Sequence, residues 1–521
     1  MRPMPCRSPG GTLVRMEKTR GRRRLVRVLV TLGVMAGVFV SAVGVAFAWL
    51  WTGADVSTAG KVRFSHRMAV PPLAESTVDA DGTRVFDLRM QAGQTEFQDG
   101  RSTPTWGFNG SYLGPTLRAN RGEQVKVRVK NTLDEASSVH WHGMHLPASM
   151  DGGPHQPVPA GGDWTPHWKV DQPASTLWYH PHPHGRTAQH VQRGLAGMFL
   201  IDDERAKRLA LPRTYGVDDL PVVVQDVTFE GARFDHGRFF LANTGFLGKR
   251  TLVNGTLDPY REVGDELVRL RLLNASTARI YTFGFDDDRS FDLIGTDGGL
   301  LEKPAAMNRV QLTPGERAEI VVRMLPGERT VLRSYPWRDG NSFERRFNGG
   351  DDSFDVLELR AAERLRKSPA LPAALGELEL PRAEDSVRGR HFELLQSGIN
   401  GRAMDMDRID ETVVRGTTET WTLRNGGDVT HNFHVHDAQF RVVEVNGKEP
   451  EPALRGRKDT VAVPLGTTVK IVLRFDGPAG PDTPYMYHCH LLKHEDDGMM
   501  GQFVVVDEGQ RAGRPPAHAG H

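Results

Sequence analysis

Cysteine is scarce in this 521-residue chain, which contains only Cys6 and Cys489. Two cysteines, one of them close to the N-terminus, cannot form the network of disulfides that holds a small secreted domain together. The folded part must therefore depend on buried apolar side chains. Its length allows about three domains of roughly 100–200 residues each.

The chain also carries almost no net charge. The chain has 66 Lys and Arg against 65 Asp and Glu, a formal balance of +1. The first 27 residues hold nine of the basic groups and one Glu, which leaves 57 basic and 64 acidic groups in the remainder, a balance of −7. A mildly acidic body argues against nucleic acid as a partner.

Charged residues are absent from the apolar run between residues 28 and 51, which follows arginines at positions 20, 22, 23, 24 and 27. A basic flank before an apolar run is typical of an export signal, and the paired arginines resemble a twin-arginine signal. Cleavage after Ala46-Phe47-Ala48 would release the body, whereas 24 uncleaved residues are long enough to anchor it in a membrane. Under both alternatives residues 1–51 form a targeting segment, and the body lies outside the cytoplasm, in the periplasm or at the cell surface. Met1 and Met16 are alternative start residues.

Helical periodicity is rare in the body, where alternating strand patterns recur at a fixed interval. Residues 122–131, 264–274 and 416–425 each alternate apolar and polar side chains, which is typical of a strand with one buried face. Each run follows an Asn-Gly turn, at Asn109, Asn254 and Asn400, and these turns are 145 and 146 residues apart. Three copies at one interval predict three related β domains.

The predicted fold class is all-β, with three β-sandwich domains after the N-terminal signal or anchor. We refer to residues 62–205, 216–360 and 386–507 as the first, second and third repeats. A linker is expected at residues 361–385 and a flexible tail at residues 508–521.

Histidine is nearly absent from the second repeat, since His236 alone lies between residues 206 and 390. Ten of the 20 histidines fall instead in four clusters of the first and third repeats. These clusters are His140-Trp141-His142-Gly143, His180-Pro181-His182, His431-Asn432-Phe433-His434-Val435-His436, and His488-Cys489-His490 followed by His494. The chemistry is therefore expected between the first and third repeats.

Each cluster contains a His-x-His pair: His140/His142, His180/His182, His434/His436 and His488/His490. Residues i and i+2 of a strand point to the same side, so each pair can present two imidazoles to one site. Eight imidazoles exceed the four ligands of one zinc ion, and imidazole is a good ligand for copper. The spacing predicts a site for several copper ions.

Cys489 lies inside the last pair and points to the opposite side of the strand. One thiolate with two imidazoles and a weak methionine ligand is the donor set of a blue-copper electron-transfer site. The candidates are His431, Cys489, His494 and Met499. The peptide chain joins this site to His488 and His490, which gives a short covalent path for electrons.

At these motifs the sequence resembles the three-domain bacterial multicopper oxidases, a laccase-like family that includes periplasmic copper-efflux oxidases. The resemblance covers nearly all of residues 75–507. It implies three cupredoxin-like Greek-key domains and four copper ions. By position, type 1 copper would be bound by His431, Cys489, His494 and Met499, type 2 copper by His140 and His434, and the type 3 pair by His142, His180, His182, His436, His488 and His490.

Two carboxylates occupy positions for which the resemblance implies proton delivery. Asp151 lies eleven residues after His140, and Glu495 directly follows His494. The reduction of dioxygen to water consumes protons, so buried carboxylates beside the cluster suit the chemistry. The alternative is that Asp151 only belongs to a turn and that Glu495 is a surface charge.

Methionine is scarce where the cuprous-ion oxidases of this family carry a methionine-rich insert, because residues 363–430 contain only Met404 and Met406. We therefore expect the edge of His494 to be open to aromatic donors. The alternative is a small metal site formed by Met404, Asp405, Met406 and Asp407.

The sequence thus predicts an exported multicopper oxidase of laccase type, which oxidises phenolic or aromatic donors and reduces O₂ to water. An oxidase of Cu(I) or another metal ion in copper tolerance is the first alternative. A non-catalytic scaffold, similar to cell-division relatives that have lost copper ligands, is the second, and the presence of all twelve ligand positions argues against it. The sequence carries no signal for the oligomeric state.

Overall fold

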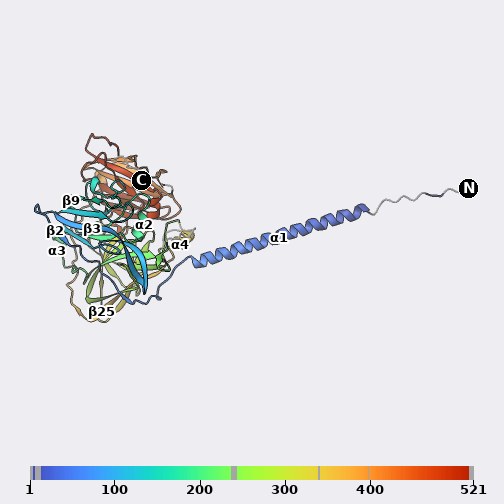
Figure 1. The fold of residues 1–521 in the computed structure, drawn as a ribbon, viewed down its shortest axis with the longest axis horizontal. Coiled ribbons are helices and arrows are strands. Elements are labelled where there is room, and N and C mark those ends of the chain that lie inside the picture. The colour runs from blue at the N-terminus through green and yellow to red at the C-terminus, as the bar shows by residue number, and fades with distance from the viewer. Residues whose placement is uncertain (1–3, 6–12, 236–242, 338–340, 397, 516–521) are drawn as a thin grey trace. The chain divides into compact units, whose positions relative to one another are not determined.

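The computed structural model describes residues 4–5, 13–235, 243–337, 341–396 and 398–515. It contains two compact units, residues 1–55 and residues 56–521. The first unit holds one long helix, α1 (Leu13–Gly53), drawn in blue in Figure 1. Within it, residues 22–53 are long and apolar enough to cross a membrane, a test that a signal sequence near the N-terminus also passes. The helix is compatible with the predicted signal or anchor.

The second unit is built mainly from strands (Figure 1). Those of the first repeat are β1 (His66–Arg67), β2 (Ser76–Val78), β3 (Arg84–Gln98), β4 (Arg101–Phe108), β5 (Leu117–Asn120), β6 (Gln124–Asn131), β7 (His140–His142), β8 (Asp163–Trp164), β9 (His167–Lys169), β10 (Ser175–His180) and β11 (Gly197–Asp202). Two short helices accompany them, α2 (Thr187–Gln192) and α3 (Glu204–Arg208).

The second repeat begins at β12 (Asp219–Val227). It continues with β13 (Phe229–Glu230), β14 (Arg233–Phe234), β15 (Arg250–Val253), β16 (Thr256–Leu257), β17 (Pro259–Asp265), β18 (Leu267–Asn274), β19 (Tyr281–Phe285), β20 (Phe291–Thr296), β21 (Gly299–Met307), β22 (Val310–Leu312), β23 (Arg317–Arg323), β24 (Arg329–Ser334), α4 (Ser342–Phe347) and β25 (Phe354–Arg366). Strand β25 runs six residues beyond position 360, into the segment expected as a linker.

The third repeat begins at β26 (Ser386–Leu395). It continues with β27 (Gly398–Ile399), β28 (Glu411–Val414), β29 (Thr418–Asn425), β30 (His431–Val435), β31 (Phe440–Val445), β32 (Thr460–Val463), β33 (Thr468–Arg474), β34 (Tyr485–His488), α5 (Leu492–Asp496) and β35 (Met500–Val506).

Each repeat contains two main sheets. In the first repeat these follow the orders β2-β3-β6-β8 and β5-β11-β10-β7, and in the third β27-β26-β29-β33-β31 and β28-β35-β34-β30-β32. The second repeat has the sheet β16-β15-β12-β18-β23-β20-β21, and β1 joins its other sheet in the order β1-β17-β25-β24-β19-β22. A large apolar cluster accompanies each pair of sheets, so burial of apolar area stabilises each sandwich.

The three repeats share a hydrogen-bonding pattern. In each, the first long strand pairs in parallel with the alternating strand: β3 with β6, β12 with β18, and β26 with β29. The turns at Asn109, Asn254 and Asn400 have left-handed φ angles of 57°, 51° and 54°, a conformation that Asn tolerates better than most residues. Each of these side chains also donates to a carbonyl and accepts from an N–H of that first strand. The same hydrogen bonds are therefore repeated at each of the three Asn-Gly turns.

One strand departs from the predicted pattern. Alternation in β18 predicts that Arg269 and Arg271 lie on a solvent-exposed face, yet they are only 7% and 5% exposed. Strand β10 of the first repeat covers this face, and its Thr176 donates to Glu319 Oε1 over 2.6 Å. Glu319 in turn binds both guanidinium groups. The charged positions therefore form a buried ionic junction between the first and second repeats.

The ionisation of Glu319 depends on this junction. Burial alone would raise the pKa of Glu319, but the guanidinium groups of Arg269 and Arg271 outweigh burial and lower this pKa to about 2. A carboxyl whose pKa is lower in the folded state stabilises the fold at pH values above its unfolded pKa. That contribution is lost as the pH falls through the folded value.

We expect Glu319→Gln to lower the free energy of unfolding by about 3–5 kcal/mol, because two buried cations lose one of the two carboxylates that they share, the other being Asp219. The difference from the wild type should be present above the ordinary Glu pKa of 4.5 and should shrink as the pH falls toward 2. Denaturant unfolding followed by circular dichroism at several pH values measures it.

Asp87→Asn is the matched control, since Asp87 pairs with Arg128 at the surface, where the two side chains are 72% and 54% exposed. This control should cost less than about 1 kcal/mol. Equal losses of the free energy of unfolding in the two variants would show that the buried junction stabilises the fold no more than a surface ion pair does.

Candidate metal centre

Four strands bring the predicted histidine pairs together. β7 pairs antiparallel with β10, which sets His140 opposite His180. β30 pairs antiparallel with β34, which sets His434 opposite His488. All eight imidazoles of the four pairs are at most 1% exposed. The structure therefore gathers the predicted pairs from the first and third repeats in one buried site.

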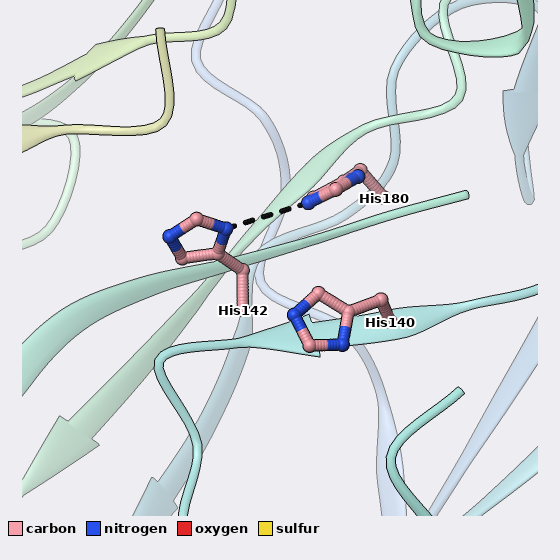
Figure 2. Close-up of side chains that lie close together, drawn as sticks. All are labelled: His140, His142 and His180. Carbon is pink, nitrogen blue, oxygen red and sulfur yellow. Dashed lines mark hydrogen bonds between the residues drawn. The ribbon is translucent and has the colours of Figure 1, made fainter. Parts of the chain in front are cut away.

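The ring nitrogens in this site face one another at short range. His142 Nδ1 lies 3.4 Å from His180 Nε2, as Figure 2 shows, with His140 close by. His488 Nε2 lies 3.2 Å from both His182 Nε2 and His436 Nε2. Several triplets of these nitrogens lie within 4.8 Å of one another, close enough to share a metal ion.

Three further nitrogens of the cluster are left for metal binding. His140 Nε2, His434 Nε2 and His490 Nε2 are buried, and within the described part of the chain they have no hydrogen-bond partner. Buried polar atoms are normally bonded, so unpartnered nitrogens beside other imidazoles indicate a cation site. Because this donor set is all imidazole, it fits copper better than the hard cations that prefer oxygen ligands.

Burial favours the neutral form of four rings in this site. Desolvation and the neighbouring imidazoles hold the pKa values of His142, His180, His434 and His436 well below the usual range for histidine. Near neutral pH each ring therefore keeps a lone pair on one nitrogen. A neutral imidazole is the form that binds a metal.

Two acidic residues lie against the outer nitrogens of four rings. Asp151 accepts from His436 Nδ1 at Oδ2 over 2.7 Å and from His140 Nδ1 at its carbonyl over 3.0 Å. The two Glu495 oxygens lie 3.3 Å from His182 Nδ1 and 3.2 Å from His488 Nδ1. Both acids are 1% exposed. Neither alternative from the sequence, a turn residue alone or a surface charge, describes them.

A second group of ligands surrounds Cys489. Its Sγ lies 3.7 Å from His431 Nδ1 and 3.6 Å from His494 Nδ1, and these two nitrogens are 3.1 Å apart. Burial raises the pKa of the Cys489 thiol to about 12. A thiolate at this position therefore needs a cation beside it.

Met499 completes the predicted set. It is 1% exposed, belongs to the same apolar cluster as Cys489, and accepts the Cys489 N–H at its main-chain carbonyl over 3.1 Å. The residues present thus match the His₂Cys donor set of a blue-copper centre with a methionine at hand.

The expectation of an open edge at His494 is wrong. His494 is 1% exposed, and its Nε2 donates to the main-chain carbonyl of Asn243 over 2.8 Å. Asn243 belongs to the second repeat and is held by Asn348 and Asp428, at 3.1 Å and 3.0 Å. A segment of the copper-free repeat therefore covers this imidazole, even though the methionine-rich insert is missing.

The alternative metal site at residues 404–407 includes Asp405, whose carboxylate already has partners in the same segment. The Asp405 carboxylate accepts from the Asp407 N–H over 3.1 Å and lies 3.5 Å from Arg408 Nη1. Among the described residues, no group of three His, Cys, Asp or Glu ligands includes Asp405 or Asp407. The contacts of the Asp405 carboxylate therefore lie within its own segment.

Sequence reasoning missed several residues that hold the ligands. Asp459 accepts from His142 Nε2 over 3.0 Å, and its carbonyl accepts from His434 Nδ1 over 2.8 Å. Asn432 accepts the His490 N–H over 2.6 Å. Asp459 has no periodic or motif signal, whereas Asn432 lies inside a histidine cluster and could have been noticed.

The regions that contain these residues are similar to regions of known proteins. Family models described as multicopper oxidase match residues 89–206 and 378–509. The chain is 35% identical to the multicopper oxidase mco of Staphylococcus haemolyticus, over 84% of this chain and 92% of that protein. It is 37% identical to the cell division protein FtsP of Salmonella typhimurium, over 90% of this chain and 98% of that protein.

Solved structures are similar over most of the chain. A laccase-like multicopper oxidase CueO from Ochrobactrum, described as active towards lignin model compounds, is 36% identical with a TM-score of 0.77 over 84% of this chain and all of that one. A multicopper oxidase from Campylobacter jejuni, described as a metallo-oxidase, is 25% identical with a TM-score of 0.75 over 87% of this chain and 98% of that one.

Proposed function

Because this chain belongs to the multicopper oxidase family, we propose that it oxidises phenolic or aromatic donors one electron at a time and reduces O₂ to water. Family membership makes it a copper-binding oxidoreductase and confirms the predicted all-β, cupredoxin-like fold. The observation that carries the proposal is the pair of buried donor sets, one built around Cys489 and one from eight imidazoles.

The proposal assigns four copper ions to these sets. His431, Cys489, His494 and Met499 would hold type 1 copper, and His140 and His434 would hold type 2 copper through Nε2. The type 3 pair would be held by His142, His180, His182, His436, His488 and His490. Bound copper would supply the one-electron steps that join donor oxidation to dioxygen reduction. The unpartnered and mutually facing nitrogens support this assignment.

The chain itself links the two sets. Cys489 is bonded through the main chain to His488 and His490. Asn432 braces this link, because its Oδ1 accepts the His490 N–H over 2.6 Å and lies 3.5 Å from Cys489 Sγ. We propose this short covalent path as the electron route from the Cys489 set to the imidazole cluster.

Proton supply is proposed for Glu495 and Asp151. Both are buried against imidazoles that line the cluster, and Asp151 Oδ1 has no hydrogen-bond partner among the described residues. A carboxylate in that position can accept a proton and pass it on toward the site of dioxygen reduction. The same contacts would also orient the rings, so the test must separate the two roles.

Organic donors are preferred over Cu(I) in this proposal. The side chains bonded to the cover over His494 belong to Asn348, Asp428 and Gln396. Their amide and carboxylate groups are hard ligands, whereas Cu(I) is selected by soft thioethers.

An aromatic donor would dock outside Asn243 and pass its electron through the bond from this carbonyl to His494. Oxidation of Cu(I) or another metal ion in copper tolerance is the alternative, which the likeness to a metallo-oxidase favours.

The proposed setting is outside the cytoplasm. The N-terminal apolar helix would direct the body to the periplasm or the cell surface as a signal, or keep it there as an anchor through residues 28–51. Export would give the enzyme direct access to extracellular aromatic donors.

We expect Cys489→Ser to abolish the blue absorption of the thiolate–copper bond and donor oxidation, because the strong type 1 ligand is lost. Copper content should fall by about one ion per chain, since the imidazole cluster keeps its ligands. Visible spectra with copper analysis measure both. Met500→Leu is the control, because Met500 is buried packing next to Met499. An unchanged spectrum in Cys489→Ser would refute the type 1 assignment.

We expect Glu495→Gln and Asp151→Asn to slow turnover by about 10²-fold or more while copper content stays complete, because each removes an ionisable proton carrier. Turnover against pH at saturating donor, measured beside copper content, tests this. Glu508→Gln changes an exposed acid near the C-terminus and should have no effect. Loss of copper in the site variants would assign them to ring orientation instead.

We expect 2,6-dimethoxyphenol to be oxidised without added copper, because the described side chains bonded to Asn243, those of Asn348, Asp428 and Gln396, are hard ligands that do not favour Cu(I). Turnover of this phenol under air, with and without excess Cu(II), measures the dependence, and Met404→Leu/Met406→Leu serves as the comparison variant. If phenol turnover requires added copper and the double variant loses this response, the cuprous-oxidase alternative replaces the proposal.

A further inference from the structure

The second repeat supplies none of the clustered histidines, yet its chain reaches the copper ligands. Residues 313–317 form the turn that leads into β23. Gly315 in this turn has a φ of +88°, and a Cβ placed there would lie 3.1 Å from the His490 ring and 3.2 Å from His142 Cε1. The turn therefore lies directly against ligands that come from the first and third repeats.

Arg317 ends this turn and is completely buried. Its Nη1 and Nη2 donate to the two Asp459 oxygens over 2.7 Å and 2.6 Å. Its Nε donates to the Thr176 carbonyl over 2.9 Å, and the remaining donors reach the Gly315 and Asp297 carbonyls over 3.1 Å and 3.0 Å. All five N–H groups of a guanidinium are thus used. Groups from all three repeats fix its position.

Asp459 transmits this position to two rings. Its Oδ1 accepts from His142 Nε2, which leaves His142 Nδ1 facing His180. Its main-chain carbonyl accepts from His434 Nδ1, which leaves His434 Nε2 facing the cluster. The hydrogen bond on one imidazole nitrogen decides which nitrogen is free to bind a metal. One residue therefore sets opposite nitrogens on two neighbouring ligands.

The glycine after His142 makes room for this pair. Gly143 has a φ of +84°, and a Cβ on it would lie 2.5 Å from Asp459 Oδ2 and 2.8 Å from Arg317 Nη2. Only a residue without a side chain allows this approach. The guanidinium also balances the charge of the Asp459 carboxylate, while Oδ1 of the same carboxylate accepts from His142 Nε2.

We propose that Arg317 is a positioning residue for the copper cluster, acting through Asp459 to fix which nitrogens of His142 and His434 face the metal. The inference rests on the proposed function, because it assumes that these rings bind copper. It gives the copper-free repeat a defined part in the site: it holds from outside the carboxylate that orients ligands of two different repeats.

The test is copper affinity of the cluster in Arg317→Lys, measured by competition with a chelator on the purified full chain. Lysine keeps the charge but loses the fork that holds both Asp459 oxygens. Loss of an outer hydrogen-bond partner typically weakens metal binding about 10- to 100-fold. We expect a loss in this range for cluster copper, with an altered type 2 electron paramagnetic resonance signal and an unchanged blue type 1 band.

Arg279→Lys is the matched control. Arg279 is also a buried arginine of the second repeat, bound to Asp226 and Asp352, but it contacts none of the copper ligands in its described bonds. This variant should lose thermal stability and keep wild-type affinity for cluster copper. Asp459→Asn provides a second test if Arg317→Lys is poorly folded, since it keeps the shape of Asp459 and weakens the acceptor for His142; we expect a loss of cluster affinity in the same range.

The outcomes separate the two proposals. Cluster affinity within twofold of wild type in Arg317→Lys, or in Asp459→Asn where that variant is used, overturns the role of Arg317 and leaves the proposed function intact. Equal losses of affinity in Arg317→Lys and Arg279→Lys also overturn it, because they would reflect general destabilisation. A wild-type chain that binds no copper overturns both proposals, and this is seen before any variant is compared.

Discussion

The structure depends on one constraint: eight imidazoles must share a single buried volume with ring nitrogens directed at one another. Nitrogens of different rings approach to 3.2–3.4 Å, a crowding that is favourable only around cations. Each ring must then be held by its other nitrogen, since a ring flip would remove a ligand. Asp151, Asp459 and Glu495 meet this need at six of the eight rings. The burial of these three acids beside the rings follows from the metal site.

The same constraint explains why the three repeats contribute different residues to the site. Two repeats share the ligands, so their relative position must be exact, and two sandwiches in contact do not fix it by apolar packing alone. The second repeat fixes it with directional bonds. Arg317 binds groups of the first and third repeats, and the Glu319 junction with Thr176 ties β18 and β23 to β10. A copper-free repeat thus keeps polar residues that would be unfavourable in an isolated domain.

Much of this architecture could be predicted from the sequence, because the relevant signals are local. Strand alternation, the Asn-Gly turns and the His-x-His spacing each lie within a few residues, and each has a direct geometric meaning. The residues that were missed act across the chain: Asp459 on His142, and Asn243 on His494. The alternation of β18 indicates a solvent-exposed side for Arg269 and Arg271. A strand pattern contains no information about the neighbouring strand that covers its second face. Contacts between repeats are invisible to any local pattern.

The cover on His494 changes how donor selectivity must be understood. A methionine-rich insert is one way to control access to the type 1 site, and its absence suggested an open edge. In this chain a main-chain carbonyl occupies the outer nitrogen of that imidazole. The carbonyl belongs to the main chain, but its place depends on the Asn243 N–H, which donates to Asn348, and on the Asn243 side-chain amide, which donates to Asp428. Asn348 and Asp428 lie in the second and third repeats, so under the proposed function the second repeat would also influence which donors reach the metal.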